Sequence, residues 1–220
     1  VAVTVCLLTE QLVCRLSGAA STLRDWSVVI TGLLLGLTLP PGLPLWMVAA
    51  GAVAAVVLGK ALFGGLGANP FNPSLVGRAF LQAAFPVAMT SWLPALAADR
   101  FTTLPASLLA MPLMQPTYDG LSGATPLALW KFDQALTPTR DLALGLVDGS
   151  TGETSSALIL LGGAYLVARN MMSWRVPAAI FAVVGGLSGI LHLVDTARYA
   201  PPGFMLVSGG LMLGAVFMAT

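Results

Sequence analysis

The stretch of the sequence best suited to carry chemistry is a run of small and polar residues: Asp119-Gly120-Leu121-Ser122-Gly123-Ala124-Thr125-Pro126. Pro126 biases Thr125 toward an extended backbone, while Gly123 and Ala124 add almost no bulk beside it. The Asp-Gly step supplies a turn just upstream. The Thr125 hydroxyl is therefore expected to be accessible to another enzyme. An ordinary loop, in which Ser122 or Thr125 caps a helix beginning near Pro126, explains the same residues equally well.

A second block, from Gly59 to Phe80, reads as a glycine-rich break followed by a helix start. Asn72 is a good N-cap and Pro73 suits the first helical position. That helix N-terminus could face an anion or a cofactor, although a broken helix packed closely on its neighbours explains the glycines as well. A Walker loop is excluded, because Lys60 precedes most of the glycines and no Gly-Lys-Ser/Thr follows them.

Several ionisable residues have both a functional and a structural interpretation. Glu10 sits in an apolar segment, where a carboxylate is costly enough to suggest a functional site, with a structural role equally open. Glu153 precedes an apolar segment and is expected to stabilise the start of a helix rather than bind an ion or a cofactor. Asp195 is expected to pair with Arg198, rather than to carry a proton or sodium ion with His192.

Ordinary structural roles account for the two cysteines and for the aromatic residues near Thr125. Cys6 and Cys14 share one apolar segment without CxxC spacing, so they read as core residues rather than disulfide, zinc or cluster ligands. Four aromatic residues flank the Thr125 stretch and could shield a planar ring, although tryptophan and tyrosine also form the ordinary membrane-interface belt: Trp92, Tyr118, Trp130 and Phe132.

The composition predicts that a lipid bilayer surrounds these residues. Hydrophobic residues make up 57% of the 220 and charged residues only 9%, with a mean hydropathy of +0.88. The segments 176–194 and 199–220 contain no Asp, Glu, Lys or Arg, and each is about as long as the roughly 20 residues that a transmembrane helix needs. The net charge of +1, without a basic run, gives no sign of a nucleic-acid partner.

Apolar runs punctuated by proline, glycine and charge predict seven helical spans, at 1–16, 26–39, 45–60, 74–96, 155–169, 176–194 and 203–220. We expect an all-α integral membrane protein, a polytopic transmembrane helix bundle with broken helices that forms a single transmembrane domain over residues 1–220. Pro40-Pro41-Gly42-Leu43-Pro44 predicts a tight helical hairpin. Because the chain opens and stops inside apolar runs, we expect a fragment lacking helices at both ends.

Charge and glycine spacing refine this expectation. Residues 97–154 hold six of the nine acidic residues and are expected to lie largely outside the bilayer, on the extracytoplasmic face. The opposite face is expected to be cytoplasmic, because five basic residues lie in its short connections: Arg15, Arg24, Lys60, Arg169 and Arg175. Close helix packing is expected at pairs of small residues four apart, namely Gly32/Gly36, Gly185/Gly189 and Gly210/Gly214.

The 119–125 stretch resembles the D-G-x-[S/T]-G-A-T motif at which a flavin transferase esterifies the threonine hydroxyl with the phosphate of FMN. The 59–80 block resembles a signature of the same family. Further matching blocks are Leu39-Pro40-Pro41, residues 85–92, residues 149–155 and Ser173-Trp174-Arg175. Together they resemble the D subunit of the Rnf complex and the related B subunit of the sodium-translocating NADH:quinone reductase. Asn69-Pro70-Phe71 and Met89-Thr90-Ser91-Trp92 look more like the Rnf protein.

This resemblance implies a membrane component of a sodium- or proton-translocating electron transport complex that exchanges electrons between ferredoxin and NAD. Thr125 would carry covalent FMN as a phosphoester, as an anchor and not a catalytic residue, so that the chain is no complete enzyme alone. The other cofactor-binding residues would be Asp119, Gly120, Ser122, Gly123 and Ala124. A second, noncovalent flavin such as riboflavin is left open.

The resemblance also implies partners and a location. The partners would be the other membrane and peripheral subunits of the Rnf complex, a flavin transferase for maturation, and membrane lipid. The chain would cross the bacterial inner (cytoplasmic) membrane several times, with the flavin loop facing the periplasm or exterior. The alternatives are the B subunit of the quinone reductase, or a non-redox channel or secondary transporter, which a broken helix and the adjacent Asn69-Pro70 and Asn72-Pro73 steps suggest.

Overall fold

A computed structural model of the chain describes residues 1–18, 22–65, 67–96, 105–112, 114 and 123–219, and these residues form helices and connections without a β-strand. They belong to two compact units. Unit 1 comprises residues 1–91 and 99–122, and unit 2 comprises residues 92–98 and 123–220. The all-α prediction is confirmed, and each unit is described by itself below.

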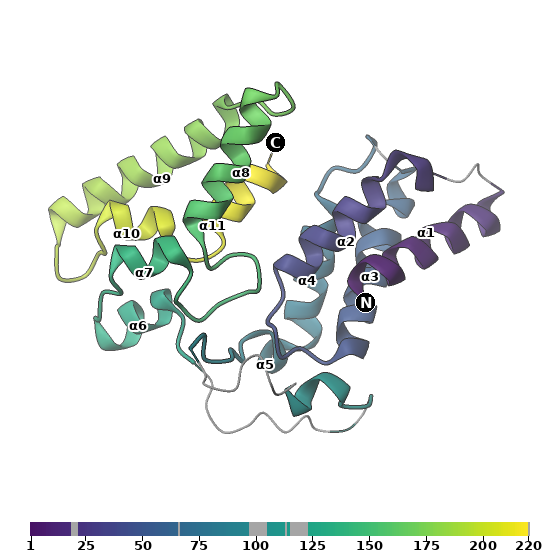
Figure 1. Cartoon of the computed structure of the whole chain (residues 1–220), viewed down its shortest axis with the longest axis horizontal. Helices are drawn as coiled ribbons and strands as arrows, with labels where there is room; N and C mark the ends of the chain where they lie inside the picture. Colours follow the sequence, from purple (N-terminus) through teal and green to yellow (C-terminus); the bar gives the residue numbers. More distant parts are fainter. Residues whose placement is uncertain (19–21, 66, 97–104, 113, 115–122, 220) are drawn as a thin grey trace. The chain divides into compact units, whose positions relative to one another are not determined.

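Unit 1 is built on four helices that pack on one another (Figure 1). They are α1 (Ala2–Ser17), α2 (Ser27–Leu37), α3 (Leu45–Gly59) and α4 (Pro73–Ala84). Shorter pieces are η1 (Leu23–Asp25), η2 (Ala61–Phe63), α5 (Pro86–Met89) and η3 (Ala106–Leu109). The core between them contains Cys6, Val28, Leu35, Val56 and Leu81, which are all but inaccessible to solvent.

Glycines allow the closest helix approaches in unit 1. A Cβ on Gly77 of α4 would overlap the backbone and Ala55 of α3, and one on Gly51 of α3 would overlap Leu81 of α4. Close packing at Gly32 was predicted and is confirmed, because a Cβ there would overlap the α1 backbone. The tightest crossing, between α3 and α4, nevertheless uses glycines outside the three predicted pairs.

Two predicted chain signals act as expected in unit 1. The proline-rich segment after Thr38 ends α2 and leads into α3 at Leu45, which gives the predicted hairpin. Asn72 caps α4: its Oδ1 accepts a hydrogen bond of 2.9 Å from the Ser74 N–H, and Pro73 occupies the first helical position. The Ser74 hydroxyl then donates to the Thr31 carbonyl at 2.9 Å, which joins α4 to α2.

Unit 2 contains the remaining helices (Figure 1). They are α6 (Pro126–Asp133), α7 (Thr139–Leu144), α8 (Ser156–Ala168), α9 (Arg175–Val194), α10 (Pro202–Val207), α11 (Leu211–Leu213) and the π-helical turn η4 (Gly214–Met218). One core cluster joins Ile159 of α8 to Leu213 and Val216 near the end of the chain. A second joins Leu142 of α7 to Phe204 of α10.

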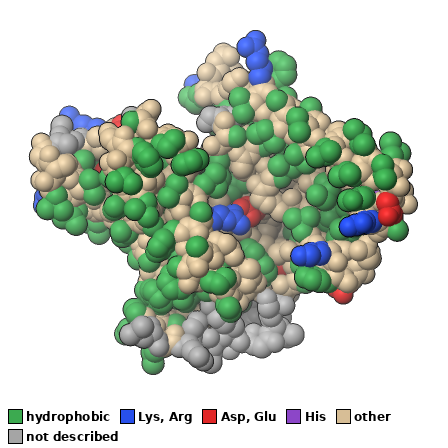
Figure 2. Space-filling view, turned by 180° about the vertical axis from the view of Figure 1, so that it is seen from behind, with side chains coloured by type: hydrophobic (Ala, Val, Ile, Leu, Met, Phe, Trp, Pro, Cys, Tyr) green, Lys and Arg blue, Asp and Glu red, His purple; other side chains and the backbone are tan. Residues whose placement is uncertain are grey.

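The surface is unusually apolar. Figure 2 shows hydrophobic side chains spread across the visible face, with charged side chains in a few small groups. On α9, Val183, Leu193 and Val194 are 66%, 85% and 76% exposed. A water-soluble domain seldom exposes a contiguous apolar face of this kind, whereas a helix in contact with lipid or another protein does.

The seven predicted spans are supported only in part. Helix is present in each of the seven intervals. Two of the predicted spans are interrupted where no break was predicted, at Phe85 between α4 and α5 and at 208–210 between α10 and α11. Among the described residues, two helices are long and apolar enough to cross a membrane, Leu45–Phe63 and Arg175–Val194. The number of spans and the single transmembrane domain remain predictions.

Candidate functional site

Thr125 is the N-cap of α6. Its backbone is extended (φ −64°, ψ 154°), and its hydroxyl oxygen accepts a long hydrogen bond of 3.3 Å from the Ala128 N–H. The extended backbone was expected from Pro126, and the capping role is the one that the ordinary-loop interpretation gave to Thr125. Thr125 is half-buried, and the preceding Ala124 is exposed. Asp119, Gly120 and Ser122 lie outside the described residues.

Gly123 is held in place by backbone and side-chain contacts with two other segments. Its N–H donates to the Trp92 carbonyl at 2.8 Å. The Asp148 carboxylate lies so close that a Cβ on Gly123 would overlap it. The same carboxylate accepts the Ala95 N–H at 2.6 Å. Gly123, two residues before Thr125, is thus linked to residues 92–95 and to Asp148. Nothing in the sequence pointed to this junction, because Asp148 is distant from Gly123 in the chain.

The aromatic residues that were expected to flank the site lie in different environments. Trp130 packs beside Phe204, with ring centroids 6.4 Å apart. Phe132 is 74% exposed, and the Lys131 ammonium lies 5.2 Å from its ring centroid. Trp92 contacts the site through its carbonyl, and Tyr118 lies outside the described residues.

Glu153 lies two residues before the cap of α8. Ser155 caps this helix by accepting the Leu158 N–H. The Glu153 carboxylate lies against Gly210, where a Cβ would overlap it, and its expected stabilisation of the start of α8 stays a prediction.

The expected Asp195–Arg198 ion pair is absent from the ion pairs of the described residues. Asp195 accepts the backbone N–H groups of Ala197 and Arg198, at 3.0 and 3.1 Å, and so closes a turn. His192 Nδ1 lies 2.6 Å from the Tyr199 carbonyl oxygen.

A buried charge cluster in unit 1 involves Glu10. Lys60, at the end of α3, donates to both carboxylate oxygens of Glu10 on α1, at 2.7 and 2.9 Å, and to the Ser27 hydroxyl of α2 at 2.7 Å. The Thr22 hydroxyl donates to the same carboxylate. Glu10 and Lys60 are only 4% and 5% exposed. The cluster therefore ties three helices together. Lys60 was expected in a short connection between helices, and it lies at the end of α3 with its side chain buried in this cluster.

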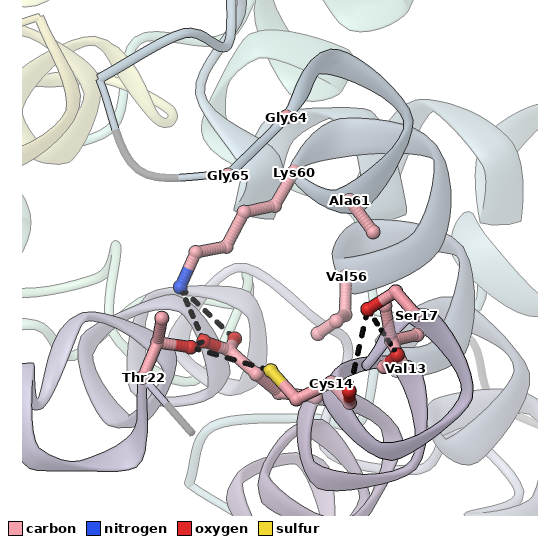
Figure 3. Close-up of a pocket in the computed structure, with 10 residues that line it drawn as sticks. Val13, Cys14, Ser17, Thr22, Val56, Lys60, Ala61, Gly64 and Gly65 are labelled. Carbon is pink, nitrogen blue, oxygen red and sulfur yellow. Dashed lines mark hydrogen bonds and ion pairs between the residues drawn. The ribbon is translucent and has the colours of Figure 1, made fainter. Parts of the chain in front are cut away.

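A cavity of about 320 Å³ adjoins this ion pair. Figure 3 shows the Lys60 side chain extending from the end of α3 toward Thr22, with the Cys14 sulfur close by. The rest of the lining is mostly apolar and includes Val13 and Val56. Cys6 and Cys14 are both free and buried, as core residues were expected to be.

Helical units with many exposed apolar side chains, and two helices long and apolar enough to cross a membrane among the described residues, are typical of a helical membrane protein. The chain belongs to the NQR2, RnfD, RnfE family, whose match covers residues 1–220.

The chain is also similar to curated proteins named as the D subunit of ion-translocating complexes. It is 40% identical over 231 residues to the D subunit of the ion-translocating oxidoreductase complex of Alcanivorax borkumensis, covering 100% of this chain and 66% of that protein. It is 37% identical over 217 residues to the D subunit of the proton-translocating ferredoxin:NAD(+) oxidoreductase complex of Clostridium ljungdahlii, covering 97% and 62%. It is 38% identical over 222 residues to the Na(+)-translocating counterpart of Acetobacterium woodii, covering 96% and 59%. The chain thus spans about three-fifths to two-thirds of the length of these relatives.

Proposed function

We propose that this chain is a membrane component of a bacterial ion-translocating electron transport complex of the Rnf type, and that it carries FMN as a phosphoester on Thr125. The family membership and the names of its relatives support the complex. The position of Thr125 at the N-cap of α6, preceded by an exposed Ala124, supports the attachment site.

The residues around Thr125 fit a phosphoester. A helix N-terminus presents unpaired N–H groups and the positive end of the helix dipole, which stabilise a phosphate. Pro126 has no N–H, but Leu127 and Ala128 supply donors in the first turn of α6. The bond that the Thr125 oxygen now accepts is long at 3.3 Å, so losing it on esterification removes little stability.

In this proposal the protein holds the flavin, and the flavin performs the redox chemistry. Bound FMN would accept and donate electrons, while α6 and the junction at Gly123 fix the point of attachment. Thr125 remains an anchor throughout. Electrons would pass between ferredoxin and NAD through the other proteins of the complex, as the names of the Clostridium ljungdahlii and Acetobacterium woodii relatives indicate for their own complexes.

The location and the coupling ion belong to the same proposal. The exposed apolar faces of α8 and α9 favour a position in the bacterial inner membrane, and the basic connections favour an orientation with the flavin loop facing outward. The relatives are named for protons in one case and for sodium in another, so the names leave the ion open. A second, noncovalent flavin stays a prediction from the resemblance.

The test is in-gel flavin fluorescence on a denaturing gel, after co-expression of the full protein with an active flavin transferase. Thr125→Val removes the hydroxyl at nearly constant volume and should abolish the fluorescent band. Thr196→Val is the matched control, because Thr196 is an exposed threonine of the same unit outside the motif, and it should fluoresce as the wild type does. An equally fluorescent Thr125→Val band would reject the anchor, and a dark wild type would favour a non-redox transporter.

A further inference from the structure

We propose that Asp148 is a positioning residue for flavin attachment: its carboxylate braces the Gly123 junction, so that the Thr125 hydroxyl is held where a transferase can use it. This inference rests on the proposed function of Thr125. Nothing in the flavin-motif resemblance involves Asp148, which lies 23 positions beyond Thr125 in the chain.

The geometry assigns a separate contact to each carboxylate oxygen of Asp148. Oδ1 accepts the Ala95 N–H at 2.6 Å, a short bond that the negative charge strengthens. Oδ2 faces the α-carbon of Gly123 and occupies the space that a Cβ would fill. Asp148 therefore contacts the segment that precedes Thr125 and the segment that runs beside it.

A third contact closes the junction. The Gly123 N–H donates to the Trp92 carbonyl at 2.8 Å, so the 92–95 segment is bonded both to Gly123 directly and to Asp148. The junction also explains why residue 123 is a glycine: a side chain would displace the carboxylate and with it the bond to Ala95.

The backbone of Thr125 is consequently restrained from both sides. On its C-terminal side Pro126 and the first turn of α6 fix its direction. On its N-terminal side only Ala124 separates it from the braced Gly123. Without the brace, the hydroxyl would sample positions away from the attacking geometry, and a displacement of about 1 Å can lower the rate of a group transfer about 100-fold.

The attachment step requires an activated flavin donor. With a flavin nucleotide phosphoanhydride such as FAD, the Thr125 oxygen forms a bond to the flavin-side phosphorus. The phosphoanhydride P–O bond breaks, and the departing nucleotide phosphate takes the hydroxyl proton in the overall balance. Asp148 takes no part in this exchange of bonds, so its loss should slow attachment without changing the product.

The experiment measures the rate of FMN attachment to the purified full protein by an active transferase, with FAD as the donor and the acceptor protein varied in concentration. We expect Asp148→Ala to lower the kcat of attachment by about 10- to 100-fold with an unchanged KM for the acceptor protein. Asp148→Asn keeps an acceptor oxygen and should recover part of the rate. Asp133→Asn is the matched control, since Asp133 is an exposed acid at the end of α6, and it should react as the wild type does.

Each outcome decides a different statement. Wild-type kcat in Asp148→Ala would overturn the inference while leaving Thr125 as the anchor. If Asp148→Ala does not fold, Asp148→Asn decides: a folded Asp148→Asn with the wild-type kcat, or a change confined to KM, would also overturn it. No attachment to wild type would instead remove the proposed function itself, and with it the role of Asp148. Gly123→Ala should reproduce the kcat loss of Asp148→Ala, and combining the two should add little.

Discussion

Lys60→Met should destabilise unit 1 strongly, because it leaves the Glu10 carboxylate buried without its counter-ion. Lys60 supplies two of the hydrogen bonds to that carboxylate, and only the Thr22 hydroxyl remains among the described donors. Removing one partner of a buried ion pair costs about 3–5 kcal/mol. The adjoining cavity of about 320 Å³ gives water access to the stranded charge. We therefore expect Lys60→Met to lower the free energy of unfolding by about 3 kcal/mol, the lower end of that range.

The double variant separates a stranded charge from lost packing. Replacing a buried ion pair by apolar residues of similar size is often neutral or stabilising. Glu10→Leu combined with Lys60→Met should therefore recover most of the stability that Lys60→Met loses. Glu10→Leu alone should be about as unstable as Lys60→Met, because it leaves the ammonium with the Ser27 hydroxyl as its remaining described partner.

The assay is thermal unfolding in detergent, followed with a thiol-reactive fluorogenic dye. Cys6 and Cys14 are the two cysteines of the sequence, and both are buried on α1 beside the ion pair, so dye reaction reports the unfolding of unit 1. Any cysteine elsewhere in the full protein is replaced by serine. Lys131→Met is the matched control, because Lys131 is exposed. Equal melting of Lys60→Met and wild type, or a double variant as unstable as either single one, would refute the reasoning.

Three further predictions concern caps, packing and pH, each read from the same melting curves. Asn72→Ala removes the cap of α4 and should lower the free energy of unfolding by about 1 kcal/mol. An unchanged melting temperature would show that the cap adds nothing to stability. Gly77→Ala should destabilise by about 1–3 kcal/mol through overlap with α3, whereas Gly186→Ala, which faces open space on α9, should stabilise by up to about 1 kcal/mol; the same sign for both would contradict the packing argument. Hydrogen bonds from the Ser27 hydroxyl and backbone N–H lower the pKa of the exposed Asp25 carboxyl below its usual value. The ionised Asp25 should therefore add its full share to the free energy of unfolding above about pH 4, and that share should disappear as the pH falls through the lowered pKa. Asp25→Asn should remove that part of the pH dependence, and an identical acid profile in the variant would contradict it.

Local features of the sequence were enough for much of the secondary structure. Each of the seven apolar intervals contains helix, because length, apolarity and proline breaks are properties of neighbouring residues. The Asn72 cap and the extended Thr125 followed from side chains one or two positions away. Helix lengths were predicted less well, since several intervals end in short turns after a break.

The long-range contacts could not be predicted in the same way. Glu10 and Lys60 are 50 positions apart, and Ala95 and Asp148 are 53 apart, so only the packed fold shows that they meet. Lys60 was placed in a short connection because it follows an apolar run, and no local signal shows that its side chain turns back into the bundle to pair with Glu10. Asp195 was assigned to Arg198 by proximity, whereas its carboxylate is used by the backbone of its own turn.

The measurement that tests the central claim most directly is tandem mass spectrometry of proteolytic peptides from the full protein, matured with an active flavin transferase. The account predicts that the peptide containing residues 123–130 carries the mass of an FMN phosphoester, and that fragment ions place it on Thr125. FMN located on Ser122 or on any other residue, or an unmodified Thr125 peptide in protein whose transferase is shown to be active, would contradict it.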